Sequence, residues 1–365
     1  MSSRVRLGTV RAPSGILVVL DAGYAGLWCD AAEDFDNDRG WPLGEADRQR
    51  VKASVDLRIT GPDAAEAGRR FDRQWHPLWL YDIPKHAIAE IEQLFREAIA
   101  PYGLDATLSV EPRRIAHRER VSLALDQGGG AGEIQISGVW AAVCSGIPTT
   151  REFLVFAEPM PPGPDSARWR RVFVEIDPAG QIASSEKVGQ SGVDWARLML
   201  ADADALGEWL HHDALDGKAD CVFWGRDAQP LADAVGAQQL GEGEFGWLDL
   251  PVTQAGERVQ TVERARVDPG WKVRVDFRPH SHHWQLMQQV RASTTESGTV
   301  EIGAAKLCGF MTSWGDGIFE VLADRDAAGR LVRVTVDCGT DAMVDRQRRF
   351  EEKWIRPGPT AGQPR

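Results

Sequence analysis

Short apolar runs separated by turn residues dominate the chain, and this pattern predicts a protein built mainly of β-strands. The run GILVVL at residues 15–20 is typical of a buried strand. Strand candidates crowd between residues 107 and 176, and three more lie at Ala305–Thr312, Ile318–Leu322 and Leu331–Val336. Turns rich in Gly, Pro and Thr separate them. We therefore expect antiparallel meanders rather than parallel strands joined by helices.

Two stretches have the spacing of an amphipathic helix. In Lys85–Ala100, apolar residues recur at three- and four-residue steps, with Pro84 before the stretch and Pro101 after it. Val193–His211 carries a broad apolar set that includes Trp195 and Leu198. Both stretches are predicted to pack on a sheet.

The predicted fold class is α+β, with two antiparallel, meander-rich β lobes and a few packed helices. The polar stretch GQIASSEKVGQSG at residues 180–192 is the best linker candidate. We predict an N-terminal lobe over residues 1–180 and a C-terminal lobe over residues 193–355. The Pro- and Gly-rich residues 356–365 are predicted to be a disordered tail.

The two strand clusters share an order of features. Gly138–Ile176 and Gly303–Val336 each contain an apolar strand, a turn and a second apolar strand that ends in an acidic residue. A Gly turn and a closing strand follow, and the closing strands lead to Asp177 and Asp337. This order reflects either an internal duplication or the general appearance of two β-meanders.

Composition and charge narrow the function classes. The 365 residues include 54 Asp and Glu against 42 Lys and Arg, which gives a formal net charge of -12. This excess repels phosphate backbones and anionic lipids, so neither a nucleic acid nor a membrane is an expected partner, whereas a basic protein is. No run of eighteen apolar residues occurs, and the five cysteines form no C-x-x-C pair. We therefore expect reduced thiols and a cytoplasmic location.

The C-terminal meander is similar to a known family. Residues 304–337 contain the turn Trp314-Gly315-Asp316-Gly317, the pair Ile318-Phe319 and a second turn that ends at Gly329. This arrangement resembles the C-terminal signature of a numbered bacterial family of domains of unknown function (4241 type). Ser313 replaces the first Gly of that family's Gly-Trp-Gly-Asp-Gly turn. The resemblance implies a stand-alone bacterial cytoplasmic protein of the immunity or interaction type, without an assigned chemistry.

One acidic loop has the spacing of cation ligands. The carboxylates are Asp34, Asp36, Asp38 and Glu45. Alternate carboxylates followed by a distal Glu suit a hard cation such as Ca²⁺, which takes six to eight oxygen ligands. Arg39 stands where an EF-hand loop requires Gly, and Pro42 interrupts the loop. The alternative is a solvated acidic loop.

One histidine cluster offers ligands for a transition metal. His280, His282 and His283 could bind Zn²⁺ together with a carboxylate such as Asp276 or Glu296. The helical H-E-x-x-H spacing is absent. The alternative is that these histidines cap the segment that follows them.

We expect a non-enzymatic protein-binding factor of the immunity or interaction type, without a cofactor, that presents an acidic surface to a basic protein. The chain has 14 Trp, a residue type that interface hot spots favour. Trp75, Trp314 and Asp316 are the candidate contact residues. The alternative function is a metal-dependent hydrolase that uses His280, His282 and His283.

Overall fold

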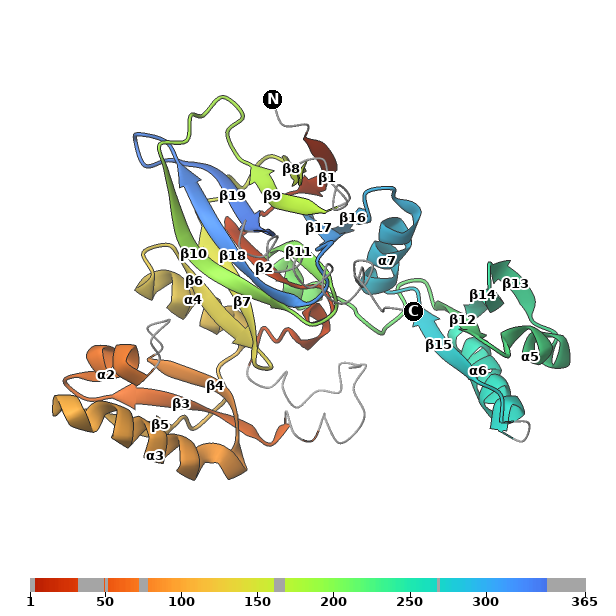
Figure 1. Ribbon diagram of the computed structural model, residues 1–365, viewed down its shortest axis with the longest axis horizontal. Coiled ribbons are helices and arrows are strands. Elements are labelled where there is room, and N and C mark those ends of the chain that lie inside the picture. Colours follow the sequence, from red (N-terminus) through yellow and green to blue (C-terminus); the bar gives the residue numbers. More distant parts are fainter. Residues whose placement is uncertain are drawn as a thin grey trace, which may run out of the picture.

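The computed structural model describes residues 4–31, 49, 52–71, 78–160, 168–267 and 270–339. This part of the chain confirms the α+β class, with two six-stranded antiparallel sheets stacked as a sandwich (Figure 1). The outer sheet has the order β1 (Val5–Val10), β8 (Phe153–Pro159), β9 (Trp169–Glu175), β19 (Leu331–Asp337), β18 (Gly317–Arg325) and β10 (Ser184–Val193). The middle sheet has the order β16 (Ser297–Ile302), β17 (Ala305–Met311), β11 (Arg197–Asp202), β2 (Ile16–Asp21), β7 (Val139–Ser145) and β6 (Ala131–Ile136).

The middle sheet is buried on both faces, which explains its nearly continuous apolar strands. In β2, Leu17 and Val19 belong to the core shared with the outer sheet. Val18 and Leu20 belong to a second core on the opposite face. The helices over that face are α4 (His117–Gln127), α7 (His282–Ala292), η1 (Ala25–Leu27) and η5 (Ala205–Glu208).

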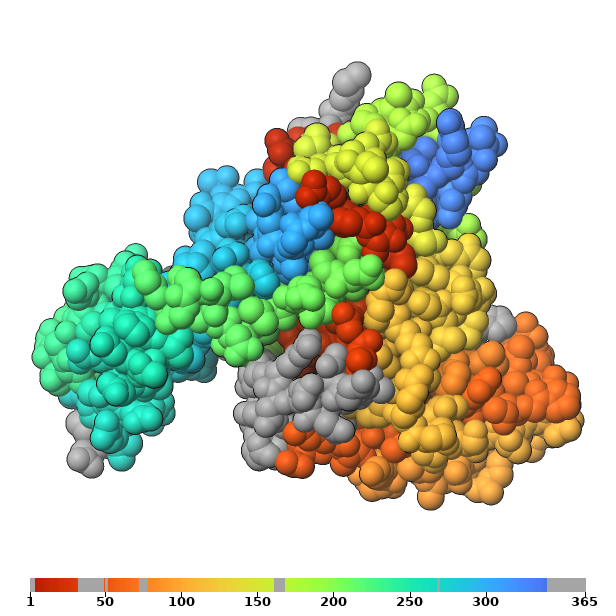
Figure 2. Space-filling view, turned by 180° about the vertical axis from the view of Figure 1, so that it is seen from behind, coloured from red at the N-terminus to blue at the C-terminus, as the bar shows by residue number. Residues whose placement is uncertain are grey.

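Each half of the chain also carries an inserted sheet backed by helices. The N-terminal insert contains β3 (Ser54–Thr60), α2 (Ala64–Phe71), β4 (Trp79–Pro84), η3 (Lys85–Ala87), α3 (Ile88–Ile99), η4 (Ala100–Tyr102) and β5 (Thr107–Val110). The C-terminal insert contains β12 (Lys218–Gly225), α5 (Ala228–Val235), β13 (Gln238–Gly241), β14 (Glu244–Pro251), α6 (Val252–Val267) and β15 (Val273–Pro279). The first lies close to α4 and β6, and the second projects from the sandwich (Figure 2).

The two halves repeat one topology. In the outer sheet, β1, β8 and β9 of the first half correspond to β10, β18 and β19 of the second. When each strand is exchanged with its counterpart, the strand order of this sheet is the same read from the opposite edge. Exchanging β2, β7 and β6 with β11, β17 and β16 does the same for the middle sheet. The inserts match as well, because β4-β3-β5 in one corresponds to β14-β12-β15 in the other. Strand order therefore supports the internal duplication over two unrelated meanders.

The predicted division into separate lobes over residues 1–180 and 193–355 is wrong. Both sheets of the sandwich contain strands from each half of the chain. The predicted linker lies mostly in β10, which pairs with β18 from Ser184↔Arg325 to Val193↔Gly317. This stretch is polar because β10 is an edge strand whose first four residues are exposed. The predicted tail at residues 356–365 lies outside the described residues.

One of the two predicted helices is confirmed. Lys85–Ala100 forms η3 and α3, whose side chains Phe95 and Ile99 are buried against the N-terminal insert. Val193–His211 is instead the end of β10, then β11 and η5. A strand that is buried on both faces has the same apolar density as a buried helix, so periodicity cannot distinguish them.

Candidate functional site

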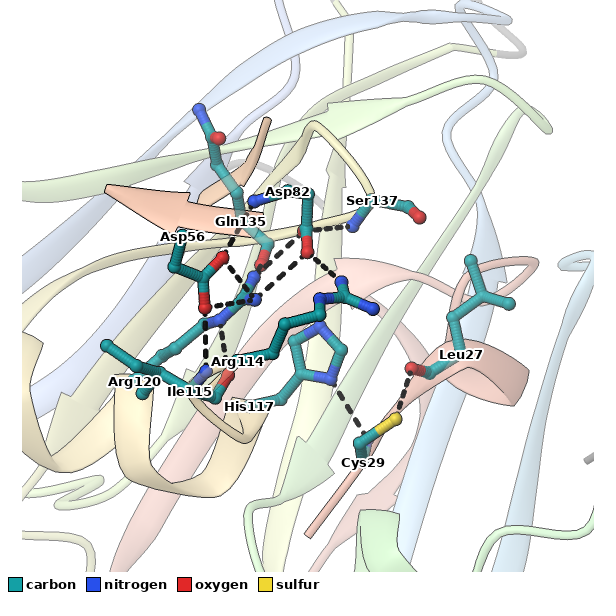
Figure 3. A network of polar contacts seen from close by, with 10 residues as sticks. All are labelled: Leu27, Cys29, Asp56, Asp82, Arg114, Ile115, His117, Arg120, Gln135 and Ser137. Carbon is teal, nitrogen blue, oxygen red and sulfur yellow. Dashed lines mark hydrogen bonds and ion pairs between the residues drawn. The ribbon is translucent and has the colours of Figure 1, made fainter. Parts of the chain in front are cut away.

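Four charged side chains cluster where the N-terminal insert meets the sandwich (Figure 3). Asp56 lies on β3, Asp82 on β4 and Arg120 on α4, while Arg114 precedes α4. The side chains of Arg120 and Asp56 are fully buried. The Arg120 guanidinium donates to both carboxylate oxygens of Asp82, at 2.8 and 2.9 Å, and to Asp56 at 3.3 Å. Arg114 also donates to Asp82.

Backbone groups make further hydrogen bonds with this cluster. Asp56 accepts the N–H of Ile115 at 2.6 Å and the N–H of Asp82 at 2.9 Å. Arg120 also donates to the carbonyl of Gln135 at 2.7 Å. The cluster therefore joins the insert, α4 and the middle sheet into one unit.

Asp82 and Arg120 keep their charges near neutral pH. Burial alone would raise the pKa of Asp82, but the positive charge and hydrogen bonds of Arg120 bring that pKa below its ordinary value. The carboxylate of Asp82 in turn raises the pKa of Arg120, although burial opposes this change. An ion pair of this kind is stable only as a complete set, because each charge compensates the burial of the others.

The C-terminal insert has a related connection with different chemistry. Asp220 on β12 corresponds to Asp56, and Asp249 on β14 corresponds to Asp82. Asp82 and Asp249 both have a positive φ, of 58° and 56°, and each donates its N–H to the buried aspartate. Asp220 pairs with His280 and with the indole N–H of Trp284, at 3.1 and 3.0 Å. A histidine and a tryptophan thus replace arginine in this half.

Sequence reasoning missed this paired site, although a signal was present. The segment Trp79-Leu80-Tyr81-Asp82-Ile83-Pro84 recurs as Trp247-Leu248-Asp249-Leu250-Pro251. Its aspartate sits in the positive-φ region that a short polar side chain tolerates. A search for repeated segments over the whole chain, rather than over the two meanders alone, finds it.

In both halves of the chain, a histidine opens a helix and accepts a backbone hydrogen bond. His117 opens α4 and accepts the N–H of Cys29 through Nδ1 at 2.9 Å. His282 opens α7 and accepts the N–H of Leu210 through Nδ1 at 3.0 Å. Since Nδ1 accepts, the neutral ring of His282 carries its proton on Nε2. Neither nitrogen of this ring then has a lone pair for a metal.

The three histidines predicted as metal ligands do not share a binding point. His280 lies between Asp216 and Asp220, with its two ring nitrogens 3.0 and 3.1 Å from the carboxylates. His283 stacks on His211 with a ring-centre distance of 4.0 Å. Within the described ranges, no group of three or more His, Cys, Asp or Glu is arranged to hold a metal ion. The predicted metal site at His280, His282 and His283 is therefore wrong, because local hydrogen bonds and stacking occupy the rings.

His280 contributes stability with a defined dependence on pH. Burial lowers its pKa, but the hydrogen bonds that the ring makes to the carboxylates of Asp216 and Asp220 outweigh burial, and the pKa lies above its ordinary value. A raised pKa stabilises the fold at pH values below the ordinary value of 6.5, and this stability is lost as the pH rises through the folded-state pKa. We expect His280→Gln to destabilise the protein by about 1–2 kcal/mol near pH 6 and by less near pH 9. Urea unfolding at both pH values tests this, with the exposed His86→Gln as control; a constant difference would contradict it.

A cavity of about 620 Å³ lies at the junction of the N-terminal insert and the sandwich. We call it the aromatic cavity, because Trp79 and Tyr81 of β4 and Trp140 of β7 line it. Glu133 and Glu186 add carboxylates to its wall. Arg120 lies 4.3 Å from the centre of the Tyr81 ring, so the buried charge cluster fixes one wall of this cavity.

A second cavity, of about 600 Å³, lies in the C-terminal half. We call it the histidine cavity, because Trp209, His211, His212 and His282 line it. Burial lowers the pKa of both His211 and His282, so both rings are neutral near pH 7. The close approach of the chain here requires glycine, since a Cβ on Gly26 would lie 2.7 Å from the His211 side chain.

Of the other candidate residues, two lie in the described part of the chain and make structural contacts. Trp314 is half-buried against the sandwich core, and its indole N–H donates to the carbonyl of Trp169 at 2.8 Å. Asp316 is exposed and accepts the N–H of Ala196. Both therefore have a structural role in the turn after β17. Trp75 lies outside the described residues, as do the proposed cation ligands Asp34, Asp36, Asp38 and Glu45.

All five cysteines are buried as free thiols. Burial raises the pKa of Cys144 and Cys221 to about 11 and that of Cys308 to about 12. A nucleophilic cysteine requires a thiolate. These three thiols therefore serve as small apolar core residues.

No protein-family model matches the chain, and neither the curated proteins nor the solved structures gave a match. Among the helices of the described part, none is long and apolar enough to cross a membrane.

Proposed function

We propose that this chain is a non-enzymatic protein-binding factor, of the bacterial, cytoplasmic immunity or interaction type, and that its partner inserts a side chain into the aromatic cavity. The observation that carries the proposal is the grouping of Trp79, Tyr81 and Trp140 around a preformed cavity. Trp and Tyr are the residue types that most often dominate binding energy at protein interfaces. The free, buried cysteines are in keeping with a reducing compartment.

Charge supports a basic partner. The net charge of -12 steers association with a positively charged protein. Within the cavity wall, Lys187 pairs with Glu320 at 2.9 Å, and Arg325 donates to the carbonyl of Gly329 at 3.1 Å. The positive side chains of the wall are thus engaged with groups of the protein itself, whereas Glu186 is exposed toward solvent.

Affinity capture from a bacterial lysate tests the proposal. Three baits are compared: the wild-type chain, Trp140→Ala and the control Trp195→Ala. Trp195 is a suitable control because the residue is 44% exposed but lies outside the aromatic cavity. We expect Trp140→Ala to weaken the captured complex by about 2 kcal/mol, or roughly 30-fold, which is typical of a hot spot. The control is expected to bind like the wild type. Equal capture by all three baits would refute the role of this cavity.

A further inference from the structure

Two histidines of the histidine cavity have a defined tautomer. The indole N–H of Trp209 donates to Nδ1 of His211 at 3.1 Å. The backbone N–H of Leu210 donates to Nδ1 of His282 at 3.0 Å. An indole N–H and a backbone N–H can only donate, so each Nδ1 must accept. Each neutral ring therefore carries its proton on Nε2.

These two Nε2–H groups are available to a ligand. Both side chains line the cavity and are only 8% exposed. Among the described residues, the hydrogen bond recorded for each ring is at Nδ1, and none is recorded at Nε2. Both rings lie about 6 Å from the Trp209 ring, at centre distances of 6.3 and 5.9 Å. The histidine cavity thus combines an aromatic wall with two imidazole rings that each carry an N–H donor.

The repeated topology shows that this site is particular to one half. Trp28, Asp30 and His117 stand at the positions of Trp209, His211 and His282. In the N-terminal half, the tryptophan N–H donates to the carboxylate of Asp30 instead of to a histidine. The hydrogen bond of the tryptophan N–H therefore does not require a histidine at the position of His211. The imidazole adds a donor that the fold itself does not need.

We propose that the histidine cavity binds a neutral amide or carbonyl ligand, whose oxygen accepts hydrogen bonds from Nε2–H of His211 and His282. Two N–H donors suit an oxygen acceptor. The rim disfavours an anion, because the exposed carboxylates of Glu208 and Asp213 also line the cavity. A volume of about 600 Å³ is in the range of small-molecule sites. This site is separate from the aromatic cavity and does not depend on the proposed protein partner.

Nuclear magnetic resonance of ¹⁵N-histidine-labelled full-length protein tests the inference near pH 7.5. We expect the Nε2–H tautomer for His211 and His282. Titration with N-acetyltryptophan amide should shift the Nε2 signals of both rings and leave exposed His86 unchanged. An Nδ1–H tautomer at either ring would overturn the proposal. So would a response to inorganic phosphate but not to the amide, or no response to either probe.

A variant pair completes the test. His211→Phe keeps an aromatic ring for stacking on His283 but removes the Nε2–H donor, so we expect about tenfold weaker binding of N-acetyltryptophan amide. The control is His86→Phe, which alters an exposed histidine of the N-terminal insert and should bind like the wild type. Unchanged affinity in folded His211→Phe would contradict the proposal, and the His282 signal reports whether this variant keeps its fold.

Discussion

Replacing Arg120 with Met is expected to lower the free energy of unfolding by about 3–5 kcal/mol, because Asp56 and Asp82 would remain buried without their main counter-charge. Urea unfolding near pH 7 measures this change. Arg118→Met is the matched control, since Arg118 lies on the same helix but pairs with Asp204, whose side chain is 62% exposed. A pair of that kind contributes about 1 kcal/mol or less.

The expected loss of stability has two possible causes, the burial of unpaired charge and the loss of side-chain volume, and a further variant separates them. The triple variant Arg120→Met, Asp56→Asn, Asp82→Asn removes the buried charges together, so it should be more stable than Arg120→Met alone. If the single and triple variants are equally unstable, desolvated charge is not the cause. Arg120→Met should also weaken partner capture, because Arg120 packs on Tyr81 of the aromatic cavity.

Acidification below pH 6.5 is expected to destabilise the protein, most strongly through three histidines. Burial lowers the pKa of His117 and of His211, and it lowers the pKa of His283 to about 3. The unfolded chain therefore takes up protons near the ordinary pKa of 6.5 that the folded chain does not bind. The free energy of unfolding should fall by about 1.4 kcal/mol per pH unit for each such histidine.

Charged neighbours strengthen this effect at His283. Arg197, Arg291 and His212 all act on its ring and disfavour a further positive charge. His283→Leu should reduce the slope of the unfolding free energy between pH 6 and pH 5 by about 1.4 kcal/mol per pH unit. His86→Gln, at an exposed position, should leave the slope unchanged. Equal slopes for the wild type and His283→Leu would show that His283 titrates normally in the folded protein.

Within the segment of residues 280–283, the pKa of one histidine is raised and that of another is lowered. His280 is stabilised as a cation by Asp216 and Asp220, whereas His283, three residues further along the chain, is held neutral by burial. The cluster HSHH therefore contains two environments that spacing alone cannot distinguish. Its prediction as a metal site failed for this reason, since a ligand set requires rings that converge rather than rings with separate partners.

The sequence by itself determined some of the local elements but not the helix predicted at Val193–His211. Pro84 and the apolar spacing of Lys85–Ala100 were enough to predict η3 and α3, because capping and periodicity act within a few residues. The crowded apolar runs predicted an antiparallel architecture, whereas the likeness of the two meanders left a duplication open until the strand order supported it. Polarity misled the prediction at β10, where an exposed edge strand has the composition of a linker.

Only the tertiary structure decided which distant residues meet. The buried charge cluster takes its residues from three elements spread over 64 positions. The packing of β3, β4 and α4 brings Asp56, Asp82 and Arg120 together. The tautomers of His211 and His282 likewise depend on donors supplied by the fold. Hydrogen bonds and buried charges depend on distances of about 3 Å. Such distances are set by the packing of whole sheets and not by the local sequence.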